Sequence, residues 1–132
     1  MRALALWGPV LVVMGLIFFA SALPDPGAPP GGLSDKGAHV VAYAALGGTL
    51  VRALARGRSA SMTPARIAAA AVLATLYGLT DELHQRFVPG RTPDPLDVAA
   101  DALGGIAGAV AVAVAARTWS SIRRSKLAHR PP

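Results

Sequence analysis

The chain has 132 residues, of which 53% are hydrophobic, so it is long enough for one domain and too apolar for an ordinary water-soluble fold. Its formal net charge is +6 at pH 7, but the basic residues flank apolar runs instead of lining one face, which argues against nucleic-acid binding. The absence of cysteine excludes disulfides, thiolate zinc sites and cysteine nucleophiles. We therefore expect a membrane protein whose main partner is the lipid bilayer.

Four apolar runs predict four transmembrane helices. Residues 3–23 carry no charge and exceed the roughly 20 apolar residues that a span needs. A loop rich in proline and glycine follows, and the second helix is expected over residues 35–55. The third (64–86) and fourth (95–116) each begin with a capping residue followed by proline, Thr63-Pro64 and Asp94-Pro95. The sequence thus predicts one all-α domain over residues 1–132, a polytopic bundle of four helices with a basic tail at 117–132.

The first apolar run has a second interpretation. Arg2, the apolar stretch and Ala20-Ser21-Ala22 together resemble a secretory signal peptide with a cleavage site. A usual signal-peptide core has about 7 to 15 apolar residues, and this run is longer. The length favours a retained helix and leaves cleavage as the alternative.

Basic residues near the helix ends predict the orientation. Ten of the 13 lie on one side, in the N-terminus, the loop between the second and third helices, and the tail. We therefore expect both termini in the cytoplasm and the protein in the bacterial plasma membrane. All seven acids then fall on the outer side: Asp25, Asp35, Asp81, Glu82, Asp94, Asp97 and Asp101.

The later helices have short uncharged stretches. These contain 15 residues between Lys36 and Arg52, 14 between Arg66 and Asp81, and 15 between Asp101 and Arg117. About 15 residues span only about 22 Å of a hydrocarbon core about 30 Å thick. The outer turns must therefore enter the membrane boundary, where ionisable groups indicate a functional site. The predicted site residues are Asp35, Lys36, His39, Asp81, Glu82, His84, Gln85, Arg91, Asp97 and Asp101.

Helical spacing sorts this cluster into three faces. They carry Asp35 with His39, Asp81 with His84 and Gln85, and Asp97 with Asp101. Two carboxylates one turn apart repel, so Asp97 and Asp101 indicate a nearby cation, either Arg91, Arg86, Lys36 or a metal ion. Arg91 is expected to form an internal salt bridge to one of them or to bind a phosphate or carboxylate. The mixed oxygen and nitrogen donors suit zinc or manganese, but no compact metal motif is present, so a cofactor is left unassigned.

Small residues predict close helix packing. Gly104-x-x-x-Gly108 on the fourth helix and Gly47-Gly48 on the second permit backbones to approach in lipid. Tyr43 and Tyr77 need no role beyond anchoring in the core or at the interface.

The polar blocks resemble one family. Asp35-Lys36-x-x-His39-x-x-x-Tyr43, Asp81-Glu82-x-His84-Gln85, Arg91 and Asp97-Val98-x-x-Asp101-x-x-Gly104 together are similar to the VanZ-like family of small bacterial membrane proteins. The resemblance covers about residues 35–108. Its founding member is linked to teicoplanin resistance, so the resemblance implies a membrane protein acting at the cell envelope.

Three classes of function are consistent with these features. The first is a protein that binds or modulates an envelope lipid or a glycopeptide-related ligand at the polar site. The second is a membrane-embedded hydrolase or transferase acting on a lipid-linked substrate, with His84 or Glu82 as acid-base, Asp81 orienting the histidine and Arg91 steadying an anion. The third is a scaffold or accessory subunit in which the polar network only locks the helices. Because no unmistakable nucleophile is present, binding ranks first.

Overall fold

Four α-helices make up the computed structural model, which describes residues 1–24, 27 and 30–128. They are α1 (Arg2–Ser21), α2 (Asp35–Leu54), α3 (Pro64–Gln85) and α4 (Pro95–Ala128). Two short 3-10 turns, η1 (Pro30–Gly32) and η2 (Ser59–Ser61), precede α2 and α3, and the described part contains no strand. The all-α prediction is confirmed. The acid Asp25 and the last residues of the predicted tail, 129–132, lie outside the described residues.

The starts of the helices follow from local capping. The Thr63 side chain accepts a hydrogen bond from the Arg66 backbone N–H before α3, and Ser34 does the same for Gly37 before α2. Asp94 Oδ1 accepts from the Leu96 N–H at 2.9 Å, and Pro95 takes the first position of α4. These side-chain oxygens satisfy N–H groups that have no partner within the helix, which fixes where each helix begins.

The end of α4 was predicted wrongly. The helix runs on to Ala128 instead of ending near residue 116. Arginine, lysine, serine and alanine are all compatible with a helix, so the change to polar residues ends the apolar stretch without ending the helix. Its 34 residues rise about 51 Å, well beyond a hydrocarbon core about 30 Å thick.

Length and apolar composition qualify three helices in the described chain to cross a membrane. These are α1, α2 and residues Pro95–Leu127 of α4. Helix α3 is not among them, since it carries Arg66 near its start and Asp81 and Glu82 near its end.

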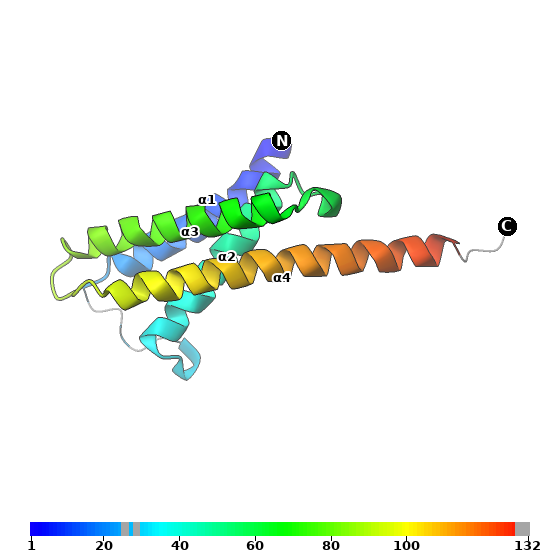
Figure 1. Cartoon of the computed structure of the whole chain (residues 1–132). Coiled ribbons are helices and arrows are strands. Elements are labelled where there is room, and N and C mark those ends of the chain that lie inside the picture. The colour runs from blue at the N-terminus through cyan, green and yellow to red at the C-terminus, as the bar shows by residue number, and fades with distance from the viewer. Residues whose placement is uncertain (25–26, 28–29, 129–132) are drawn as a thin grey trace.

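The helices pack around the crossing of α2 with α4. Figure 1 shows α3 and α4 lying alongside each other, with α2 crossing α4 steeply. At the crossing, a Cβ on Gly47 would collide with the Gly105 carbonyl, and one on Gly108 would collide with the Ala44 carbonyl. The prediction that glycines permit close approach is therefore confirmed. The crossing brings the start of α2 against the start of α4.

Helix α1 lies on the outside of this core and is joined to it by two hydrogen bonds. The Tyr77 hydroxyl of α3 donates to the Met14 carbonyl at 2.8 Å, and Arg52 Nη1 of α2 donates to the Ala5 carbonyl at 3.1 Å. The large apolar side chains of α1, such as Leu4 and Phe19, are mostly exposed, which suits contact with lipid. Helix α1 is thus an integrated element of the bundle.

Candidate functional site

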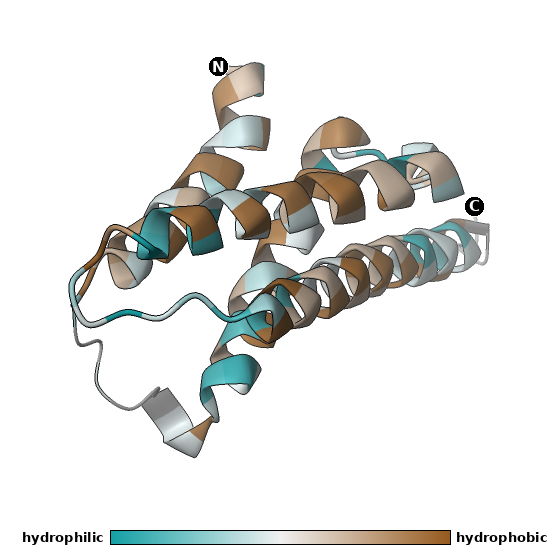
Figure 2. Cartoon of the chain, turned by 60° about the vertical axis from the view of Figure 1, so that its left-hand side comes forward, coloured by the Kyte–Doolittle hydropathy of each residue, from teal (hydrophilic) through white to brown (hydrophobic). Residues whose placement is uncertain are grey.

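Polar side chains gather at one end of the bundle. Figure 2 shows hydrophilic residues where α2 and α4 begin and where α3 ends. Several of these side chains are buried there: Asp81, Glu82, Gln85, Asp97 and Asp101, all with at most 5% exposure. Buried carboxylates are rare unless they are paired, so their partners define what this end can do.

Lys36 links α2 to the start of α4. Its Nζ donates to Asp94 Oδ2 at 2.6 Å and to Asp97 Oδ1 at 2.7 Å. Asp97 is buried on α4, whereas the Lys36 side chain is 43% exposed. Of the cations proposed from the sequence, Lys36 is the one that reaches Asp97. The bridge from Arg91 to Asp97 or Asp101, one of the alternatives above, is not formed.

His39 contacts the second carboxylate of the pair. Its Nδ1 donates to Asp101 Oδ1 at 2.8 Å, while its Nε2 lies 4.0 Å from Asp97 Oδ2. Asp101 is fully buried and packs onto α3 at Gly78, where a Cβ would collide with the carboxylate. When the Asp101 carboxylate accepts the Nδ1 proton, Nε2 is the ring nitrogen that faces Asp97. The two carboxylates predicted to share a face therefore have different partners, both from α2.

Glu82 joins α3 to the loop before α4. Its Oε2 accepts from the Asp94 backbone N–H at 2.9 Å, while Oε1 has no hydrogen-bond partner among the described residues. The Lys36 ammonium and the Leu96 N–H hold the pKa of Asp94 below its usual range, because both stabilise the ionised carboxylate. Asp94 thus connects the ends of three helices.

A cavity of about 240 Å³ opens beside this network, between α1, α2 and α3. Its apolar wall includes Ile17, Ala20, Leu23, Ala38 and Ala42, and its polar lining is Ser21, Asp35, His39, Tyr43, Asp81, Gln85 and Arg91. Four of these polar residues are at most 5% exposed and, within the described chain, have a buried atom that makes no hydrogen bond of standard geometry: Ser21 Oγ, Tyr43 OH, Asp81 Oδ1 and Gln85 Nε2. Ser21 and Gln85 lie next to the Asp81 carboxylate, so the three side chains form one polar group. Such atoms are costly in a closed interior and are expected where a ligand or water binds.

Most of the predicted site residues meet at this end, but they divide between two features. The paired network contains Lys36, Asp97, Asp101 and Glu82, and the cavity contains Asp35, Asp81, Gln85 and Arg91, with His39 in both. His84 is near Asp81 but does not line the cavity, and its ring packs on Phe18 with centroids 4.6 Å apart. A catalytic role of His84 stays a prediction.

Two cavity residues were missed from the sequence. Ser21 was assigned to a cleavage-site pattern and Tyr43 to anchoring, yet both present a buried hydroxyl to the cavity. The spacing of Tyr43, one helical turn after His39, places both on the same face and could have indicated it. No such signal exists for Ser21, because its position depends on how α1 packs.

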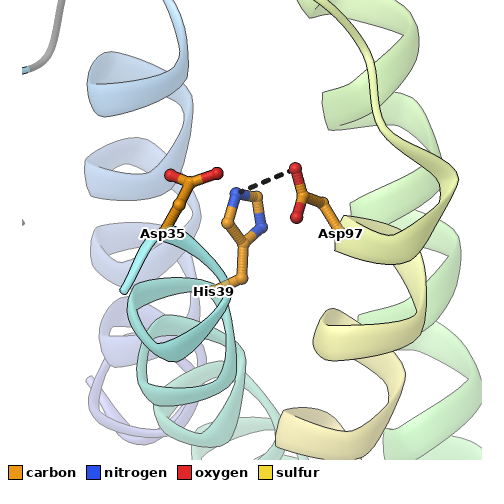
Figure 3. A group of neighbouring side chains, drawn as sticks. All are labelled: Asp35, His39 and Asp97. Atoms are coloured by element: carbon orange, nitrogen blue, oxygen red, sulfur yellow. Dashed lines mark ion pairs between the residues drawn. The ribbon is translucent and has the colours of Figure 1, made fainter. Parts of the chain in front are cut away.

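Three side chains at the cavity edge form a group of metal-ligating type. Figure 3 shows His39 between Asp35 of the same helix and Asp97 of α4. One donor atom from each lies within 4.8 Å of the other two. Asp35 is exposed and Asp97 is buried, so the group extends from the surface inward.

Comparison with known proteins gives one match. The pattern of the VanZ/LLP1 family fits residues 6–116, which is most of the chain and includes α1 as well as the polar blocks. No curated protein and no solved structure matches the chain. The resemblance seen in residues 35–108 therefore extends in both directions, over the helix that lines the cavity and most of the apolar part of α4. On this evidence the chain belongs to the VanZ/LLP1 family.

Proposed function

We propose that this protein spans the bacterial plasma membrane four times and binds the polar head of an envelope lipid, or of a lipid-linked ligand, in its outward-facing cavity. Membership of the VanZ/LLP1 family and the three apolar helices support a membrane protein. The observation that carries the binding role is the cavity with its buried polar lining, where Ser21, Tyr43, Asp81 and Gln85 make no hydrogen bond of standard geometry through one buried atom each.

Helix α3 serves as the fourth span in this proposal. Its charged residues Asp81 and Glu82 are only 5% exposed, so they face protein instead of lipid. Its outer surface carries the large apolar side chains Leu76, Leu79 and Leu83, each more than half exposed. An apolar outer surface with the charges turned inward is what a lipid-facing helix needs.

The topology follows from the ten basic residues on one side. Reporter fusions after Arg58 and within residues 27–32 test it. We expect a reporter that works only in the cytoplasm to be active after Arg58 and inactive in the 27–32 loop. Activity in the 27–32 loop would contradict the proposed orientation.

The chemistry of the cavity suits a headgroup that carries both charges. Asp81 offers a buried carboxylate, and the hydroxyls of Ser21 and Tyr43 both donate and accept. Arg91 lines the same cavity, and its guanidinium fork suits a phosphate. The volume is smaller than that of a drug-sized pocket, about 300 to 1,000 Å³, and larger than the roughly 30 Å³ of one water. We assign the ammonium or hydroxyl groups of the lipid to Asp81 and its phosphate to Arg91.

Lipid analysis of purified protein tests this assignment. Asp81→Asn keeps the shape of the side chain but removes its charge. A charge-assisted hydrogen bond contributes about 1.5 to 3 kcal/mol, so we expect binding of the co-purified lipid to weaken about 10- to 100-fold. Native mass spectrometry of protein extracted from bacterial membranes measures the bound lipid.

Thr80→Val is the matched control, because Thr80 is the neighbouring residue on α3 and is exposed. It should retain the lipid of the wild type, and both variants should keep the wild-type Tm. Equal lipid occupancy in wild type and both variants would reject the binding site. Loss of lipid together with a large fall in the Tm of Asp81→Asn would indicate a structural lock instead.

A membrane-embedded enzyme is the second candidate, supported by the contact between His39 and Asp101. A carboxylate that holds Nδ1–H leaves Nε2 free to take a proton, as a general base requires. This assigns the acid-base role to His39 instead of His84. Turnover of the lipid that co-purifies with the wild type, absent in His39→Gln, would favour the enzyme over the binding protein.

A further inference from the structure

We propose that Asp35, His39 and Asp97 bind a divalent transition-metal cation, Zn²⁺, at the edge of the cavity. The three ligand atoms would be one carboxylate oxygen of Asp35, Nε2 of His39 and Oδ2 of Asp97. This inference goes beyond lipid binding and does not depend on it.

The distances leave room for an ion. His39 Nε2 and Asp97 Oδ2 lie 4.0 Å apart, which is too long for a hydrogen bond. Zinc binds nitrogen and oxygen at about 2.0 to 2.2 Å, so two ligands at a tetrahedral angle stand about 3.4 Å apart. Closing the gap needs only a small movement of two side chains. Asp35 is exposed, and Figure 3 shows its carboxylate beside the His39 ring, where it can supply the third ligand.

Asp101 prepares the histidine as a ligand. A metal-binding histidine usually donates its other ring N–H to a carboxylate, which fixes the ring and makes it more basic. His39 has this arrangement, since Nδ1 donates to the fully buried Asp101 at 2.8 Å and Nε2 is directed towards Asp97. Asp101 is therefore a positioning residue and not a ligand.

The charges around these three side chains also favour a bound cation. Asp35 and His39 also line the cavity that contains the buried Asp81, which forms no ion pair with the described residues. Lys36 neutralises only one side of Asp97, by binding Oδ1, and leaves Oδ2 facing His39. Buried carboxylates that outnumber their cationic partners are stabilised by an additional cation.

Three protein ligands leave one tetrahedral position open. That position would take water or an anionic group of a bound molecule. A closed structural zinc site has four protein ligands, so this site is of the exchangeable type, and we expect chelators to remove the ion without unfolding the bundle.

Zinc titration of the full-length protein in nanodiscs tests the proposal. The protein is treated with EDTA, desalted and titrated with ZnCl₂ by isothermal calorimetry, with bound zinc counted by native mass spectrometry. We expect one zinc per wild-type chain and loss of this binding in His39→Ala. Asp101→Asn should weaken zinc binding about 10- to 100-fold, which is the usual effect of changing a residue that hydrogen-bonds a metal ligand.

Two further variants distinguish a loss of zinc binding from a loss of folding. Asp35→Asn changes an exposed ligand, so it should lose affinity while keeping the wild-type Tm. Asp94→Asn changes a neighbouring carboxylate that pairs with Lys36 but lies outside the ligand group, and it should bind zinc like the wild type. Zinc binding that is absent in the wild type, or unchanged in both His39→Ala and Asp35→Asn, would overturn the proposal. Lipid occupancy measured in EDTA reports separately on the proposed function.

Discussion

Helices α2 and α4 meet in two regions that are held in different ways. At the crossing, glycines bring the backbones into contact, and Gly108 lies against the Ala44 carbonyl. At the polar end, long side chains reach across from Lys36 and His39 to Asp97 and Asp101. The first region depends on the absence of side chains and the second on their charge.

The difference teaches which region fixes the structure and which is available for function. Backbone contact tolerates no added atom, because the interior is closely packed and a carbonyl cannot turn aside. Side-chain pairs at the boundary can change partners, which a binding site requires. Substitutions in the crossing should therefore impair folding. At the polar end, the loss of stability should be larger for a buried side chain than for an exposed one.

Gly108→Leu should have the largest effect. Its side chain would collide with the Ala44 carbonyl of α2 and force the helices apart. Ordinary overpacking costs about 1 to 3 kcal/mol, and we expect a larger loss here because backbone must move. Membrane abundance and the Tm in detergent measure it. Gly15→Leu is the control, since the space around Gly15 is open. Equal Tm values for the two variants would disprove the close crossing.

Asp101→Ala should have an intermediate effect. It leaves the Nδ1–H of His39 without its acceptor, and a buried donor without a partner costs about 1 to 3 kcal/mol. The donor left behind belongs to a neutral imidazole, so the cost stays below that of a buried charge without a partner. A fall in Tm smaller than that of Gly108→Leu is expected. If Asp101→Ala were the more damaging of the two, the polar end would be the part that fixes the fold.

Asp94→Asn should have the smallest effect on stability, because it removes only the exposed ion pair with Lys36 and leaves the bond from Lys36 to the buried Asp97 in place. The ion pair with Asp94 is well exposed on both sides, so water and salt screen it, and the difference in Tm from wild type should shrink in added salt. The pKa of Asp94 is lowered in the folded protein, so the stabilisation is present at neutral pH and is lost as pH falls through that lowered pKa.

Acid unfolding curves of wild type and Asp94→Asn should accordingly converge at low pH. Thermal unfolding followed by circular dichroism between neutral and acid pH makes the comparison. A difference in Tm that persists after Asp94 is protonated would show that its charge is not what stabilises the protein.

The helices were largely predictable because their signals are local. Thr63-Pro64 and Asp94-Pro95 marked two starts that the structure confirms. The end of α4 was not predictable from polarity, since a helix that leaves the apolar layer continues as long as its residues favour it. Whether α3 crosses the membrane also depends on tertiary structure, because Asp81 and Glu82 are acceptable there only if they face inward.

The site was predictable as a set of residues but not as a set of contacts. Spacing along one helix placed Asp97 and Asp101 on a common face. Their partners come from another helix, and which carboxylate receives Lys36 and which receives His39 is decided by the glycine crossing. Contacts between helices depend on distances that no pattern within a single helix contains. Ser21 was missed for this reason.

The polar contacts can form only in a certain order while the chain is being synthesised. Synthesis proceeds from the N-terminus, so Lys36 and His39 are made before their partners at positions 94, 97 and 101. Until α4 is made, Lys36 and His39 lack the carboxylates that bind them in the folded protein, and Glu82 lacks the Asp94 N–H. The last helix to be made therefore completes the polar contacts of α2 and of Glu82 on α3. A chain interrupted before residue 94 therefore leaves these groups of α2 and α3 without their partners.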